Sequence, residues 1–176
     1  VRVLGEFPAG DDDTVIALRR IQDVMTAVSS LVKGAPPVLE KVELWSVAER
    51  AVVATRPHDT RIEIAGEQGI RGWGNAALLE QVVENLVQNA IVHNLPEQGT
   101  VWVTTGVHPK GVVLTVENTG EKLTPQLVST LGEPFLRGTK RIRTEHAGVG
   151  LGLAIVKSIS QAHDGTLTLT PREAGG

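Results

Sequence analysis

A glycine-rich run that leads directly into an apolar helix constrains this chain more than any other feature. The run spans Gly148–Gly152, and the apolar residues after it predict a helix to about His163, ended by Asp164-Gly165. Glycines let the backbone approach a ligand closely. The unpaired N–H groups and the dipole at the start of a helix favour an anion. The run therefore predicts a loop that binds phosphate.

A second helix, well upstream, carries two asparagines on one face. Asn75 is expected to cap this helix, and Asn85 and Asn89 are one turn apart, so their amides project from the same side. An asparagine inside a helix can simply bind nearby backbone groups. Beside a phosphate loop, however, the Asn89 oxygen is a suitable ligand for Mg²⁺. The two segments together predict a nucleotide site that includes a metal ion.

The order of predicted elements indicates a mixed α/β fold. Strands are expected near Val42–Leu44 and at Arg61–Ile64, and a helix capped by Ser46 and Glu49 between them, to about Thr55. The later elements are a hairpin of 101–105 and 112–116, a short helix from Thr124-Pro125, and a strand at 166–170. This order predicts a two-layer α/β sandwich, a mixed sheet covered on one face by helices.

The first part of the chain predicts a helix of a different kind. From about Asp13 to Val32 the apolar residues are spaced three and four apart, as in a helical bundle: Leu18, Ile21, Met25, Val28 and Val32. The helix either packs on its own domain or forms half of a hairpin that pairs with another chain. The bundle spacing and the break at Gly34–Pro37 favour the hairpin. We expect a partial hairpin and linker over 1–36 and a separate domain over 37–176.

Composition excludes several functions. The chain has no cysteine, which rules out thiolate catalysis, disulfides and cysteine-based zinc sites. Its net charge is −3 and its aromatic content is 3%, so neither charge attraction nor base stacking favours nucleic acid. No apolar run reaches the ~18 residues of a membrane span.

The segments Glu84–Ala90 and Gly148–Val156 together resemble the ATP-binding domain of sensor histidine kinases. This family lies within the ATPase group that includes gyrase, Hsp90 and MutL, and the resemblance runs from about Pro37 to Gly176. It implies a Bergerat-type fold with ATP and Mg²⁺ as cofactors. It also implies transfer of the γ-phosphoryl group to an upstream histidine, for relay to a response regulator. The intact protein would be a homodimer with this domain in the cytoplasm and an anchor in the cell membrane.

The resemblance also assigns roles to single residues. It implies that Asn89 binds the metal, that Asn118 accepts a hydrogen bond from the adenine amino group, and that Asn85 and Arg137 are catalytic. Arg137 lies among clustered cations that can neutralise transferring charge. The further residues implied in cofactor binding are His93, Gly120, Lys140, Arg141, Gly148, Val149, Gly150, Leu151 and Gly152.

Three departures from the family pattern set the alternatives. Val92 and His93 stand where the kinases have a lysine and an aromatic residue, and Asn118 stands where they usually have aspartate. None of the five histidines lies in a phosphoacceptor sequence. Asn85 cannot act as a base toward water, because an amide takes no proton at neutral pH. The chain is therefore expected to bind ATP without phosphorylating itself. An anti-sigma-type serine kinase and a degenerate nucleotide-binding module are the other interpretations.

Overall fold

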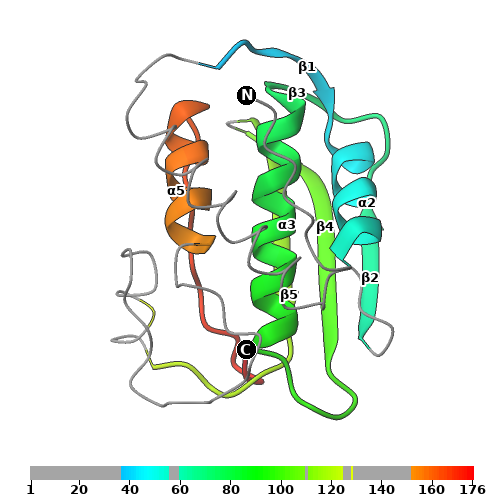
Figure 1. The fold of residues 1–176 in the computed structure, drawn as a ribbon, viewed down its shortest axis with the longest axis vertical. Helices are drawn as coiled ribbons and strands as arrows, with labels where there is room; N and C mark the ends of the chain where they lie inside the picture. Colours follow the sequence, from blue (N-terminus) through cyan, green and yellow to red (C-terminus); the bar gives the residue numbers. More distant parts are fainter. Residues whose placement is uncertain (1–36, 56–59, 110, 125–127, 129–151) are drawn as a thin grey trace, which may run out of the picture. The chain divides into compact units, whose positions relative to one another are not determined.

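The computed structural model describes residues 37–55, 60–109, 111–124, 128 and 152–176. All of them belong to one of the chain's two compact units, Ala35–Gly176. In chain order the elements are β1 (Glu40–Glu43), α2 (Leu44–Thr55), β2 (Arg61–Gly66), β3 (Arg71–Gly74), α3 (Ala76–Val92), β4 (Thr100–His108), β5 (Gly111–Asn118) and α5 (Gly152–Ala162) (Figure 1).

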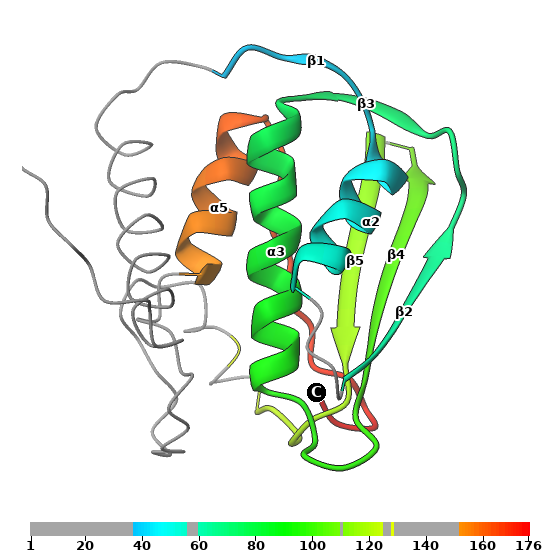
Figure 2. The same cartoon turned by 45° about the vertical axis from the view of Figure 1, so that its right-hand side comes forward.

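The described strands form one mixed sheet and one small antiparallel pair. In the larger sheet the order is β2-β4-β5, with β2 parallel to β4 and β4 antiparallel to β5. Strands β1 and β3 pair antiparallel. Figure 2 shows α5, α3 and α2 side by side in a layer on one face of the larger sheet. The predicted α/β arrangement, with helices on one face of a mixed sheet, is confirmed.

The core lies between this helix layer and the sheet. Along β4, Val101 and Val103 are fully buried while Trp102 between them is only partly covered, because side chains alternate across a strand. Val47 of α2 and Val87 of α3 are also fully buried and belong to the same apolar cluster. Each such side chain contributes about 1.5–3 kcal/mol relative to an exposed one. The burial of one face of α3 leaves its other residues available for the site.

The start of α3 agrees with the prediction from the sequence, whereas the start of α2 does not. Asn75 is extended and its side chain accepts from the backbone N–H of Leu78 at 3.1 Å, as an N-cap should. The predicted cap of α2 by Ser46 and Glu49 is wrong, since that helix begins at Leu44.

Glu43 lies immediately before α2 and takes the place that the sequence assigned to Ser46. Its carboxylate accepts from the Ser46 hydroxyl at 2.6 Å and from the Gly69 N–H at 2.8 Å. These two bonds, led by the one from Ser46, lower the pKa of Glu43. A carboxylate just outside a helix also interacts favourably with the helix dipole, so the acidic residue explains the earlier start.

Two strands differ from expectation. Strand β3 was not predicted, and residues 166–170 form no strand although Leu167 and Leu169 alternate with exposed threonines. The end of α5 is closed by a bond from the Gly165 N–H to the Ser160 carbonyl at 2.8 Å, with Asp164 at φ 54°. The residues beyond keep the alternation of burial, but they make no ladder with any described strand.

Several predictions fall outside the described residues. They are the helix from Asp13 to Val32, most of the helix predicted from Thr124-Pro125, and the cation cluster at 137–143. Among the described helices, none is long and apolar enough to cross a membrane.

Candidate nucleotide-binding site

The predicted site residues of α3 lie along a single face of its C-terminal half. Asn85, Asn89 and His93 are spaced four apart, so they follow one another along the helix. The buried residues of the same half, Val87 and Ala90, are turned toward the core instead. The side chains of Asn85 and Asn89 are half-buried, and that of His93 is exposed. The polar face therefore borders solvent at the end of a firmly packed helix.

The start of α5 approaches Asn85 closely. A Cβ added to Gly152, the first residue of α5, would lie 3.2 Å from the Asn85 Oδ1 atom. The Asn85 Nδ2 atom donates to the Gln81 carbonyl of its own helix at 2.8 Å. The amide oxygen thus faces the end of the predicted phosphate loop. The structure brings these two parts of the sequence together.

Asn89, which the sequence predicts to bind the metal, offers a single amide oxygen at this face. Its half-buried amide makes no hydrogen bond with any described residue. The described residues contain no group of three or more His, Cys, Asp or Glu side chains placed to hold a metal. Mg²⁺ often takes few protein oxygens and completes its shell with phosphates and water. The single amide fits an ion that enters with a nucleotide, and the metal role of Asn89 stays a prediction.

Asn118, at the end of β5, is oriented by two carbonyl groups. Its Nδ2 atom donates to the Thr119 carbonyl at 2.6 Å and to the His93 carbonyl at 3.4 Å. These contacts fix which end of the amide is the nitrogen and leave the Oδ1 atom as an acceptor. An acceptor is what the adenine amino group requires. The second bond also ties the end of α3 to the end of β5.

Position 120 requires a glycine because the C-terminal end of α3 lies very close to it. A Cβ at this position would lie 2.7 Å from the His93 carbonyl oxygen and 3.1 Å from the Asn118 Nδ2 atom. Real Cβ atoms do not approach that closely, so only glycine fits without movement. Gly120, Asn118 and His93 therefore form one compact corner of the site.

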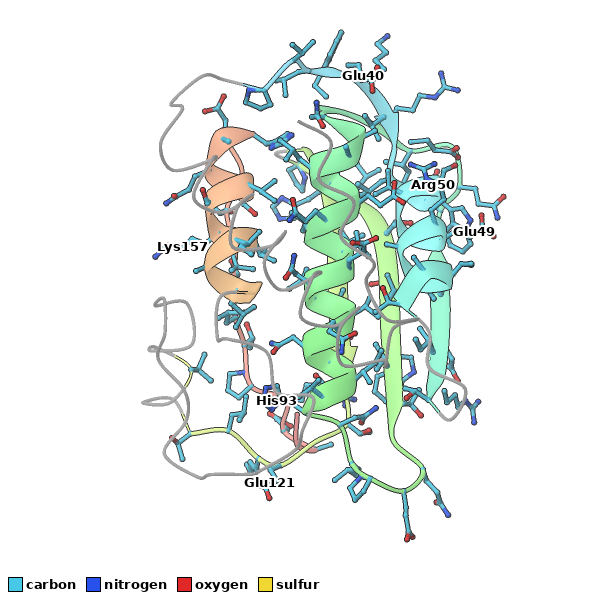
Figure 3. The ribbon with its side chains drawn as sticks, viewed as in Figure 1. Glu40, Glu49, Arg50, His93, Glu121 and Lys157 are labelled. Carbon is cyan, nitrogen blue, oxygen red and sulfur yellow. The ribbon has the colours of Figure 1, made fainter. Side chains whose placement is uncertain are left out.

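His93 ends α3, with its N–H bonded to the Asn89 carbonyl at 3.1 Å. Its ring is exposed by surface area, yet the surrounding protein removes enough water to lower the pKa of the imidazole. The neutral ring is favoured in the folded state. A neutral aromatic ring is better suited to contact a base than to bind phosphate. Figure 3 shows His93 at the end of α3, near the loop that carries Glu121.

A neighbouring network was not predicted from the sequence. The Thr119 hydroxyl donates to the Asn94 Oδ1 atom and accepts from the Thr100 N–H, the latter at 2.9 Å. Asn94 Oδ1 also accepts from the Leu95 N–H at 2.9 Å. An asparagine shortly after a helix and before Pro96 is a turn signal that points to this role. The network fixes the strand end that carries Asn118.

The remaining predicted site residues lie outside the described part of the chain: Arg137, Lys140, Arg141, Gly148, Val149, Gly150 and Leu151. Their roles stay predictions from the sequence.

Comparison with known proteins identifies the family. Residues 74–176 match the family model described as histidine kinase-, DNA gyrase B-, and HSP90-like ATPase. The sensor protein CutS of Streptomyces coelicolor is 40% identical over 142 residues, which cover 77% of this chain and 33% of CutS. The chain thus spans about a third of the length of that relative.

Two solved structures resemble this one. The mycobacterial sensor histidine kinase MprB superposes with a TM-score of 0.61 at 28% identity, covering 72% of this chain and 81% of that structure. The histidine kinase domain of the E. coli osmosensor EnvZ gives 0.58 at 31% identity, covering 81% and 86%. The matched family model includes α3, Asn118, Gly120 and α5. The chain therefore belongs to the histidine kinase-, gyrase- and HSP90-like ATPase family, as the catalytic ATP-binding domain of a two-component sensor histidine kinase.

Proposed function

We propose that this domain binds Mg-ATP between the C-terminal half of α3 and the start of α5. In the intact protein it would pass the γ-phosphoryl group to a histidine on an upstream helical hairpin. The observation that carries the proposal is the approach of Asn85 to Gly152, which joins an amide face to the end of a glycine run at a helix start. Membership of the ATPase family supports ATP as the nucleotide.

The proposed roles follow the position of each group. Asn89 would hold Mg²⁺ with the phosphates, and the Asn118 oxygen would accept from adenine. Asn85 would help to position the phosphates, since its nitrogen is held by Gln81 and its oxygen faces α5. The loop cations, with Arg137 as the family-matched one, would neutralise charge on the phosphoryl group.

The proposed setting is a homodimeric kinase anchored in a membrane, with a response regulator as the final acceptor. Residues 1–36 would supply part of the helical hairpin and 37–176 the ATP-binding domain. The relatives named as sensor proteins support this setting, and they extend well beyond the matched region.

The isolated chain is proposed to bind ATP without phosphorylating itself. Phosphoryl transfer depends on holding the acceptor in line with the γ-phosphate. No histidine of this chain lies in the expected acceptor sequence, and Asn85 offers no base to activate water.

The test is calorimetry of the chain with ATP, with Mg²⁺ and with EDTA, followed by labelling with γ-³²P-ATP. We expect Mg²⁺-dependent binding and no acid-labile label until a fragment that bears the upstream hairpin is added. Absence of ATP binding would contradict the proposal. An acid-stable phosphoserine on an added protein substrate would favour the serine kinase, and binding without any transfer would favour the degenerate module.

A further inference from the structure

A histidine outside the proposed site bridges the far ends of α3 and α5. The His163 Nε2 atom lies 3.0 Å from the backbone N–H nitrogen of Asn75, just before α3. The His163 Nδ1 atom lies 2.8 Å from the Ile159 carbonyl of α5. One imidazole thus links the C-terminal end of α5 to the N-terminal end of α3, and Figure 1 shows the two helices side by side.

The two bonds require one form of the ring. A carbonyl oxygen only accepts and a backbone N–H only donates, so Nδ1 must carry the proton and Nε2 must be bare. The ring also lies close to Gly74, since a Cβ added there would be 3.5 Å from its Cδ2 atom. His163 is therefore a directional contact with a defined tautomer.

The residues of α5 that are buried are all apolar. Ile155, Val156 and Ile159 are the buried residues of α5. Apolar burial is non-directional, so it holds two helices together better than it fixes their displacement along the axis. A directional bond at one end supplies what the apolar face lacks.

We propose that His163 is a positioning residue that sets how far α5 extends along α3, and thereby places Gly152 against Asn85. The α5 helix, Gly152–Ala162, is a rod about 16 Å long. A shift at its C-terminal end therefore reappears at its N-terminal end, where the phosphate loop enters. The ATP-binding test of this role rests on the proposed function, whereas the tests made without nucleotide do not.

The first test is the NMR spectrum of the full 176-residue chain without nucleotide. The ¹⁵N shifts of the His163 ring report the tautomer, and a proton on Nδ1 is expected. An NOE between the Gly152 Hα and the Asn85 side-chain amide reports the placement of α5. A ring protonated on Nε2 alone would overturn the bridge, whether or not the chain binds ATP.

The second test compares three variants in ATP binding and in thermal unfolding. His163→Leu removes both bonds, while His163→Gln keeps an acceptor for the Asn75 N–H. Ile159→Val removes one buried methyl but keeps the carbonyl that His163 binds, so it is a control for lost packing.

We expect His163→Leu to weaken ATP binding about tenfold, the equivalent of roughly one net hydrogen bond. The Gln variant should recover most of that loss, and Ile159→Val should bind as wild type despite a lower Tm. The Gly152–Asn85 NOE should weaken only in the Leu variant. If ATP affinity and the NOE in the Leu variant match those of Ile159→Val, His163 has only a structural role. If wild type shows the NOE but binds no ATP, the proposed function fails while the NOE series still decides the positioning role.

Discussion

The two halves of α3 are built for different purposes. The N-terminal half is held by the Asn75 cap, by the bridge to His163 and by Leu79, whose side chain lies against Gly74. The C-terminal half keeps its buried face but presents Asn85, Asn89 and His93 on the other. There, the amide of Asn85 bonds to its own helix, and that of Asn89 has no partner among the described residues.

This difference shows how one helix can be both a structural and a binding element. Buried valines and capping bonds fix the position of α3, so the amides need contribute little to stability. A half-buried polar group that water can reach costs little stability even where it lacks a protein partner, and it stays available to a ligand. Stability and function should therefore separate along the helix, and substitutions on its two faces should have different effects.

The largest effect is expected from Asn89→Ala in the intact kinase. If the amide holds Mg²⁺ with the phosphates, its loss should lower phosphotransfer by at least about a hundredfold, as removal of a single catalytic electrostatic group does. The free energy of unfolding should change by less than about 0.5 kcal/mol, as for surface substitutions. Radiolabel transfer and urea unfolding measure the two quantities. Normal transfer in this variant would remove the metal assignment.

The converse is expected for Val87→Ala, two residues earlier on the buried face. Val87 is fully buried in the apolar cluster, and its truncation should cost about 2 kcal/mol in unfolding free energy. ATP affinity below the unfolding temperature should change little. Urea unfolding and calorimetry on the same sample give the comparison. A large loss of ATP affinity in Val87→Ala, below its unfolding temperature, would show that the two faces are not separable.

The corner at the end of α3 gives a third test, Gly120→Ala. The new methyl would meet the His93 carbonyl at 2.7 Å, so either the helix end or the loop must move. We expect ATP affinity to fall about tenfold, or ~1.4 kcal/mol, because the Asn118 amide is bonded to the same carbonyl. Gly106→Ala is the matched control, since nothing lies within 4 Å of an added Cβ there. Equal affinities for both variants would place adenine elsewhere.

Elements that depend on local sequence patterns could be predicted, whereas elements that depend on a distant partner could not. The Asn75 cap and the β4–β5 hairpin follow from capping residues, turn residues and strand alternation. Strand β3 was missed because Arg71-Gly72-Trp73-Gly74 has poor strand composition and depends on pairing with β1. Residues 166–170 have strand alternation but no described partner strand, and alternation alone does not make a ladder.

The candidate site could be predicted only in part, because some of its contacts join residues that are far apart in the sequence. Helix spacing and the family resemblance both point to Asn85 and Asn89 on one face of α3 and to Gly152 at the start of α5, and their roles stay predictions. The bonds from Asn118 to the His93 carbonyl and from Thr119 to Asn94 join residues far apart in sequence. Such contacts depend on how α3 and β5 end in space, which no local pattern encodes. The His163 bridge was missed for the same reason.

The smallest effect should come from the pH dependence of stability at His93. Desolvation lowers the pKa of this ring in the folded protein, so between the usual histidine value and the lower folded value the unfolded chain binds more protons. Stability therefore rises with pH across that window, and acidification removes part of it. His93→Gln should flatten this slope, whereas His108→Gln, at the end of β4, controls for loss of a histidine elsewhere. Urea unfolding at several pH values from about 5 to 8 measures the slopes. If His93→Gln leaves the slope as it is in wild type, the ring is as well solvated as its exposed surface suggests, and the polar half of α3 carries no proton-linked contribution to stability.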